Sequence, residues 1–301
     1  MNDWKKILDS KQKCVFNSYI HLKKPDHRTS FSYVNENPIR EIVTAIFLDS
    51  NGNIPENYEP FTCELDPGEV IKIDAGALLK RDNFVGSSML IIRPADQNET
   101  MIIKNKDSVS SWSSPQTSCE IGTAAFPSLN MKGVKENQSY YMFCSGVTSD
   151  EKKKTQIVVF NHSTDSGYED EVEFSPKLQN LKGKSLIGKN LKVKPFGVMI
   201  LDSDEVFGEE GRNLLAETSG RGSLTMFHRG HIFSSFFFHV DRETENLICG
   251  SHTQPPMGVF MNPVALQHYW LTSIAPTVPF SSQIVSLLRK IKYYGKSPDN
   301  S

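Results

Sequence analysis

The 301-residue chain contains no apolar run of about 18 residues, and its first 13 residues, MNDWKKILDSKQK, are polar. We therefore expect neither a transmembrane helix nor a secretory leader, and we expect a cytoplasmic protein. The formal charge is −2 at neutral pH. Because a surface that holds phosphate backbones needs a basic excess, this charge argues against a nucleic-acid partner.

Cysteine is sparse, and its spacing is irregular. The five cysteines occupy positions 14, 63, 119, 144 and 249, without any C-x-x-C pair. An odd, scattered set is typical of reduced thiols and not of a disulfide framework or a structural zinc site.

Motifs that mark common enzymes are also missing. The sequence has no G-x-S-x-G nucleophile elbow, no G-x-x-x-x-G-K phosphate loop and no G-x-G-x-x-G after a strand. These absences argue against the familiar serine hydrolases, P-loop nucleotide hydrolases and dinucleotide-binding enzymes.

What the sequence does contain is a series of short segments rich in β-branched and aromatic residues, such as TSFSYV, EIVTAIFL, EVIKID, QIVVFN and FSSFFFHV. Turn signals such as Asp-Ser-Asn-Gly-Asn at 49–53 and Asp-Pro-Gly at 66–68 separate them. Short strands at regular spacing without long intervening helices predict an all-β protein of antiparallel sandwich or barrel type.

The segments recur at a long period. YYMFCSGV at 140–147 echoes CVFNSYI at 14–20, with Ser145 lying 127 residues after Ser18. PGEVIKID at 67–74 similarly matches PFGVMILD at 195–202, and both pairs keep their order along the chain. A period of this length indicates duplicated domains. We predict two tandem sandwich copies, 1–138 and 139–301, that arose by internal duplication.

The second copy is the longer one. Matches after Asp202 fit an offset of 136, which places about eight extra residues between Asp202 and Gly222. A third echo, YWLTSIA, predicts a closing strand at 268–275 of the second copy. Residues 281–293 have apolar positions at helical spacing behind a serine cap and predict a C-terminal amphipathic helix.

The phrase FFFHVDRETENLICGS at 236–251, together with the length of one copy, resembles the sensory rhodopsin transducers. Those are small β-sandwich proteins that assemble and bind partners. The resemblance implies a binding role for a duplicated version and no catalytic residues.

Two groups of histidines in the second copy are candidates for chemistry. In the first, Arg229-Gly230 is predicted to form a two-residue turn that sets His228 opposite His231. With His252, these side chains suit an anionic ligand or a partner carboxylate. His21 and His27, in the first copy, are interpreted as surface residues.

The second group is an alternative metal site made of His239, Asp241 and His252, which could hold one iron or zinc ion. A simple hairpin with a loop at 242–245 places His252 four residues along the sheet from His239. That separation is about 13 Å and too long for ligands of one ion unless a bulge intervenes.

These features favour a non-catalytic binding or assembly module that recognises a protein, a carbohydrate or a small anionic ligand, without a cofactor and with homo-oligomerisation left open. The alternative is a metal-dependent enzyme that uses the histidines of the second copy. An enzyme needs convergent polar groups in a pocket, whereas a module needs only an exposed patch.

Overall fold

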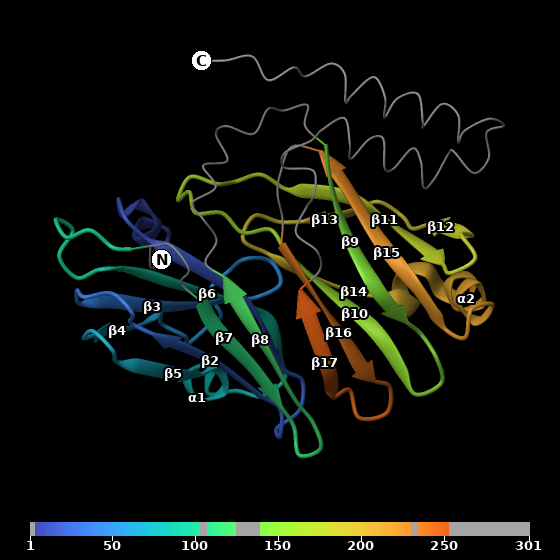
Figure 1. The fold of residues 1–301 in the computed structure, drawn as a ribbon, viewed down its shortest axis with the longest axis horizontal. Helices are drawn as coiled ribbons and strands as arrows, with labels where there is room; N and C mark the ends of the chain where they lie inside the picture. The colour runs from blue at the N-terminus through green and yellow to red at the C-terminus, as the bar shows by residue number, and fades with distance from the viewer. Residues whose placement is uncertain (1–3, 103–106, 125–138, 230–233, 253–301) are drawn as a thin grey trace, which may run out of the picture.

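The computed structural model describes residues 4–102, 107–124, 139–229 and 234–252. The chain is mostly β-strand, and every strand pairing in these ranges is antiparallel, as the sequence predicts (Figure 1). Over the described ranges, no helix combines the length and the apolar character that crossing a membrane requires.

The first half contains a short 3-10 helix, eight strands and one helical turn: η1 (Trp4–Asp9), β1 (Cys14–Leu22), β2 (Arg28–Val34), β3 (Glu41–Leu48), β4 (Phe61–Leu65), β5 (Val70–Asp74), α1 (Ala75–Leu79), β6 (Phe84–Pro94), β7 (Asp107–Ser113) and β8 (Ser118–Ala124). The second half follows with β9 (Ser139–Thr148), β10 (Lys153–Phe160), β11 (Val172–Asn180), β12 (Ser185–Ile187), β13 (Leu191–Val193), β14 (Val198–Asp202), α2 (Ser203–Ala216), β15 (Arg221–Arg229), β16 (Ser234–Asp241) and β17 (Leu247–His252).

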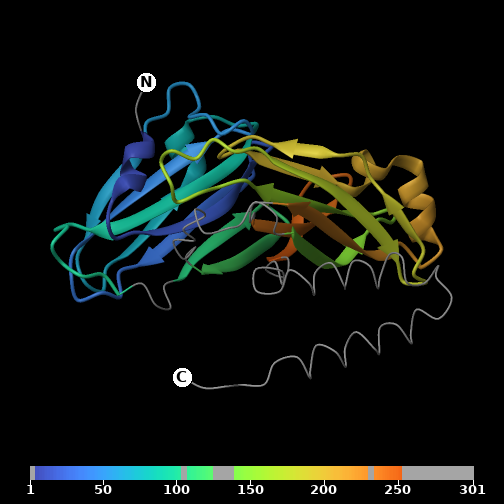
Figure 2. The same ribbon diagram turned by 90° about the horizontal axis from the view of Figure 1, so that it is seen from above.

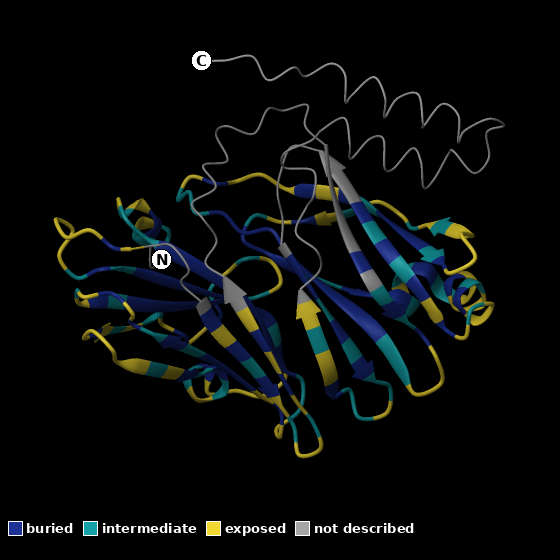
Figure 3. Ribbon diagram, in the orientation of Figure 1, coloured by how far each residue is buried: buried dark blue, intermediate teal, exposed yellow. Residues whose placement is uncertain are grey.

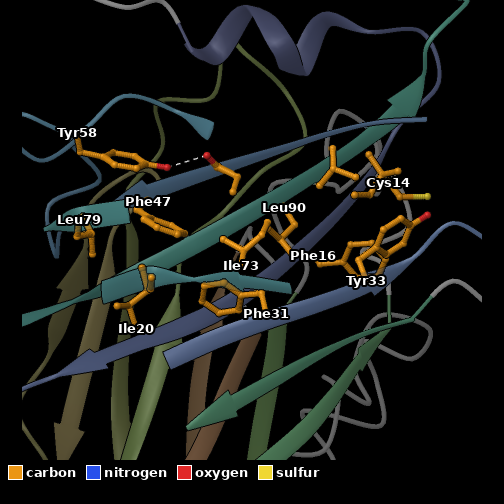
Figure 4. Close-up of a cluster of buried hydrophobic side chains, with 14 of the residues drawn as sticks. Cys14, Phe16, Ile20, Phe31, Tyr33, Phe47, Tyr58, Ile73, Leu79 and Leu90 are labelled. Atoms are coloured by element: carbon orange, nitrogen blue, oxygen red, sulfur yellow. Dashed lines mark hydrogen bonds between the residues drawn. The ribbon is translucent and has the colours of Figure 1, made fainter. Parts of the chain in front are cut away.

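In the first half, two four-stranded sheets pack face to face. Their strand orders are β1-β6-β3-β4 and β5-β2-β7-β8. Side chains that alternate inward from both sheets form the core between them, including Phe16, Phe31, Phe47 and Leu90 (Figure 4). Tyr58 closes one end of this core, and its buried hydroxyl donates to the Ala45 carbonyl at 2.7 Å.

The second half repeats this topology. Its sheets have the orders β9-β15-β11-β12 and β14-β10-β16-β17, and β13 also pairs with β11. Reading β9 for β1 and each later strand in turn, with β13 left out, reproduces the order of the first half in both sheets. Asp74 caps α1 and Asp202 caps α2 through their carboxylates, directly after equivalent strands. The extra residues of the second half lie mainly in α2, which has 14 residues against five in α1.

One buried asparagine occupies the same place in each half. Asn35 follows β2 and Asn161 follows β10, and both are fully buried. Each side-chain amide donates to two backbone carbonyls, those of Ile39 and Leu65 for Asn35. Asn161 bonds to Asp170 and Val193 in the same way. The amide satisfies carbonyls that irregular loops would otherwise leave buried without partners.

The two halves meet along an extended contact, which we call the seam. Tyr19, Trp112 and Ile121 of the first half pack there against Val158, Phe236 and Phe238 of the second. A second patch sets Trp4 and Met89 against Phe196 and Tyr168. Figure 2 shows the two sandwiches side by side.

Burial along the central strands follows from the seam. In a strand with one solvent-exposed face, buried and exposed residues alternate. In β10, by contrast, every residue of Thr155–Phe160 is buried (Figure 3). One face of β10 looks into its own sandwich, where Ile157 and Val159 lie, and the other carries Val158 and Phe160 into the seam. The seam therefore covers apolar surface that neither half could leave in water.

Two sequence predictions about connections need correction. The segment after β15 does not make the predicted hairpin, because β15 pairs with β11 and β9 whereas β16 pairs with β10 and β17. The chain crosses from one sheet to the other there. The offset of 136 is also wrong for β16. His239 lies opposite Thr155 of β10, and Trp112 lies opposite Thr29 of β2 in the same way, so Trp112 is the counterpart of His239. The predicted strand at 268–275 and helix at 281–293 lie outside the described residues.

Candidate functional site

A small crevice opens where three loops meet at one end of the seam. It is lined by His21, His27 and Arg28 from the turn between β1 and β2, by Trp112, Ser113, Ser114 and Thr117 around the turn between β7 and β8, and by Leu247 of β17. Its volume is about 180 Å³ with the open mouth included. We call it the seam crevice. The β7–β8 and β16–β17 hairpin loops, which lie beside the crevice, are at the lower edge of Figure 1.

His21 and His27 form a stacked pair at the base of the crevice. Their ring centroids are 4.9 Å apart with an interplanar angle of 18°. Both are buried, with 3% and 4% of their surface exposed, so the interpretation of them as surface residues is wrong. The loop between β16 and β17 covers them from the second half. The residues that make this contact are more than 200 positions apart in the sequence, so no local sequence pattern predicts it.

The hydrogen bonds of His21 define its tautomer. Its Nε2 lies 3.3 Å from the Glu245 carbonyl oxygen, which can only accept, so Nε2 carries the hydrogen. Nδ1 is then the acceptor for the Tyr19 hydroxyl at 3.1 Å. Both nitrogens of the neutral ring are satisfied, and burial lowers the pKa of His21 to about 3.

His27 has only one of its ring nitrogens satisfied. Its Nε2 lies 2.9 Å from Asn246 Oδ1, and Asn246 Nδ2 in turn donates to Gln116 Oε1 at 2.9 Å. Since the Asn246 amide nitrogen is engaged with Gln116, its oxygen accepts from His27 Nε2–H. His27 Nδ1 is buried and has no hydrogen-bond partner. An unpartnered buried polar atom beside a crevice is a feature that calls for a ligand or a water.

Of the three cations around the crevice, Arg28 alone makes no side-chain hydrogen bond or ion pair within the described part of the chain. Lys23 is paired with Glu245 at 2.9 Å, and this bond holds the pKa of the Glu245 carboxyl below its usual value. Lys24 donates to the Thr244 carbonyl. Arg28 is exposed and makes no ion pair within the described part of the chain. The crevice is therefore lined by an arginine without an ion pair, by hydroxyl-bearing residues and by a buried histidine.

Acid should destabilise the protein through two buried histidines. Burial lowers the pKa of both His21 and His162 to about 3, and His162 Nε2 lies 3.0 Å from the Ser87 hydroxyl. An unfolded histidine has a pKa near 6.5, so the unfolded state binds more protons than the native state between pH 6.5 and 3. Stability is complete above pH 6.5 and is lost as the pH falls.

Each of the two histidines should contribute a slope that approaches about 1.4 kcal/mol per pH unit below pH 6. Urea unfolding at pH 7.5, 6 and 5 measures it, above the range in which carboxylates titrate. His162→Gln removes one titrating group and should lower the slope by up to about 1.4 kcal/mol per pH unit, while His21 and His239, whose pKa burial also lowers, keep their share. A free energy of unfolding that stays constant from pH 7.5 to 5 would contradict the prediction.

The structure separates most of the predicted anion-binding residues. His228 and Arg229 lie at the end of β15, opposite Tyr140 and Ser139 of β9. His252 ends β17 in the other sheet, opposite Phe236. His231 lies outside the described residues. The predicted hairpin that was to join His228 to His231 is absent, because β15 and β16 belong to different sheets.

Two of the three alternative metal ligands, His239 and Asp241, make hydrogen bonds to nearby threonines. A bulge in the pairing of β16 with β17 sets His239 opposite Cys249, three residues before His252. His239 Nδ1 lies 3.0 Å from the Thr148 hydroxyl and 3.1 Å from that of Thr155. Asp241 accepts from the Thr244 backbone and hydroxyl and closes the hairpin turn. Within the described ranges, no three His, Cys, Asp or Glu side chains are grouped to hold a metal ion.

Comparisons with known proteins do not assign a family. No family model matches the chain, and no curated protein matches it. Two crystal structures of a glycosyl hydrolase family 2 member from Bacteroides cellulosilyticus align with 79% of this chain at 6% sequence identity and a TM-score of 0.19. The chain covers 27% and 26% of those chains, about a quarter of their length. A similarity of this size carries no argument about fold or function.

Proposed function

We propose that the protein is a non-catalytic binding module whose ligand is a small oxyanion held in the seam crevice. One observation carries the proposal. Arg28, which makes no ion pair within the described part of the chain, lines the same crevice as His27, a buried residue whose Nδ1 has no hydrogen-bond partner. Arginine presents a planar set of donors that matches the oxygens of an oxyanion. Ser113, Ser114 and Thr117 also line the crevice, and the hydroxyls of Ser114 and Thr117 bond to each other at 3.0 Å.

The crevice is small and open. Its 180 Å³ counts the open mouth, and the enclosed part has room for about one water molecule, so an anion would be held at the mouth. Sugar chains and peptide segments are too large for it. Of the ligand classes that the sequence favours, a small anion fits best. A binding role also agrees with what the resemblance to the sensory rhodopsin transducers implies.

The architecture gives a reason for joining two sandwiches in one chain. We infer that the halves are copies of one ancestral sandwich, since their strand orders, their capping aspartates and their buried asparagines correspond. The crevice uses loops from both halves, and ligand sites are common at such interfaces. Fusion of two copies would then have created the site.

Removing the Arg28 guanidinium should abolish most of the binding. We expect Arg28→Ala to weaken the binding of inorganic phosphate by at least about tenfold, because a charge-assisted hydrogen bond contributes about 1.5 to 3 kcal/mol. Calorimetric titration of the full chain with sodium phosphate in a chloride buffer measures this effect.

Arg221→Ala is the matched control for this experiment. Arg221 is an exposed arginine at the start of β15, outside the crevice, and its removal changes the net charge equally. Equal weakening in both variants would indicate a general charge effect and would overturn the assignment of the site. The proposal also fails if the unaltered chain binds no phosphate.

A further inference from the structure

We propose that the segment after His252 packs over the second half and closes the end at which β9 meets β16 and β17, with the predicted helix 281–293 as the cover. The second half closes the equivalent end of the first half. The inference concerns a surface that lies outside the seam crevice, and it does not depend on the proposed anion site.

The end of the first half is formed by four side chains that the second half buries. Tyr19 of β1, Trp112 of β7, and Cys119 and Ile121 of β8 are each at most 8% exposed. Trp112 also ties the two sheets together, because its indole donates to the Tyr19 carbonyl at 2.9 Å. The apolar residues of the second half that cover this end include Val158, Phe160, Phe236 and Phe238.

The strand pairing identifies two counterparts of these residues in the second half. His239 is the counterpart of Trp112. Cys249 of β17 lies opposite His239, as Cys119 of β8 lies opposite Trp112. Cys249 is therefore the counterpart of Cys119, and both pairs lie on the two strands at one edge of a sheet.

The other two counterparts follow from the same correspondence. Ser251 takes the place of Ile121, since each lies two residues after the cysteine on its strand. Gly146 takes the place of Tyr19, because in both halves the backbone amide two residues later donates to the equivalent threonine of the neighbouring sheet. We call Gly146, His239, Cys249 and Ser251 the end patch.

The end patch is accessible, whereas its counterparts are buried. Cys249 and Ser251 are exposed, and Gly146 and His239 are half-buried. Figure 3 shows exposed positions along β17. Phe237 on the same strand as His239 is also only partly buried. The residues of the end patch are smaller than tyrosine, tryptophan and isoleucine, so a segment that covers them has to supply the apolar volume itself.

A second copy of the chain is a poor match for the end patch. The face of the second half that closes the first half is apolar at three positions, Val158, Ile200 and Phe238. The pairing of β2 with β5 and β7 places polar residues at the equivalent positions of the first half, Ser32, Lys72 and Ser111. Burying that polar face is unfavourable, so copies of the chain should not repeat the seam head to tail.

The chain's own C-terminal segment is the better match. β17 ends at His252, the residue after Ser251 of the end patch, and residues 253–301 follow. The predicted helix 281–293 carries an apolar stripe of Ile284, Leu287, Leu288 and Ile291. An amphipathic helix of this kind buries its apolar stripe against a partner surface. Residues 253–280 can extend over roughly 90 Å, so the helix can reach the end patch.

The test uses the native thiols of the full chain, labelled with iodoacetamide and followed by peptide mass spectrometry. Cys249 reports on the end patch, and the half-buried Cys63 of β4 is the internal reference. Leu287→Asp combined with Leu288→Asp disrupts the apolar stripe. We expect it to speed the labelling of Cys249 at least about tenfold and to leave Cys63 unchanged.

The matched control is Gln283→Asp combined with Ser286→Asp, which adds the same charge away from the apolar stripe and should label as the unaltered chain does. Equal labelling of Cys249 in the unaltered chain and the Leu287→Asp, Leu288→Asp chain would overturn the proposal. Protection of Cys249 that falls on dilution would overturn it too, because a second copy would then be the cover.

Labelling of the buried Cys14 would show that a variant has unfolded. In that case the unaltered chain still decides. An uncovered Cys249 is more exposed than Cys63 and should react faster, whereas a covered Cys249 should react more slowly than Cys63. Faster labelling of Cys249 would mean that the C-terminal segment leaves the end patch open.

Discussion

Replacing Asn161 by alanine should lower the free energy of unfolding by about 3 kcal/mol or more. The side chain is fully buried, and its amide donates to the carbonyls of Asp170 and Val193 at 2.9 and 3.0 Å. Its oxygen also accepts from the Tyr168 hydroxyl. Alanine would remove three hydrogen bonds, among them those to the buried Val193 carbonyl and the buried Tyr168 hydroxyl, and each such bond lost in the interior costs about 1 to 3 kcal/mol.

Asn35→Ala should have an effect of similar size in the first half. Asn35 donates to Ile39 and Leu65 at 2.8 and 3.1 Å and accepts from the Asn37 backbone at 2.9 Å. Urea unfolding of the two variants measures both effects. Asn51→Ala is the control, because Asn51 is exposed and its replacement should change stability by less than about 0.5 kcal/mol. A large loss in one half and none in the other would contradict the equivalence of the two asparagines.

Local sequence patterns were sufficient to predict the class of fold. Short β-branched segments between turn signals gave an all-β protein, which the structure confirms. The match of 67–74 with 195–202 placed β5 and β14 in equivalent positions, each ending in a capping aspartate. These features depend on neighbours within a few residues, and the sequence carries them directly.

The candidate site could not be predicted in the same way. His21 and His27 are buried by a loop more than 200 residues later, and the pairing of the halves decides this burial. The predicted turn at Arg229-Gly230 failed for a related reason. A strand followed by a short polar segment can form a hairpin or cross to the facing sheet, and only the partners of β15 and β16 distinguish these outcomes. The sequence feature that could have indicated the candidate site is the pair His21 and His27, which flanks a turn that is rich in lysine.

Trp112→Ala should be the most destabilising single replacement at the seam, with an expected loss of about 4 kcal/mol. The indole is 2% exposed and packs against Phe238 at 5.0 Å between ring centroids, with Phe236 nearby. Its Nε1 donates to the Tyr19 carbonyl at 2.9 Å. Alanine would leave a cavity between the halves and an unpaired carbonyl on β1.

The contact at the seam is tested by the hydrogen-exchange protection of the second half, which carries no mutation. Because β10 and β16 carry Val158 and Phe238 into the contact with Trp112, we expect their amides to lose hydrogen-exchange protection together with those of β2. Val109→Thr is the control, since Val109 lies on the same strand but is 38% exposed. Full protection of β10 and β16 in Trp112→Ala would mean that each sandwich is stable alone. In that case the seam would serve to form the crevice and would not be needed to hold the fold.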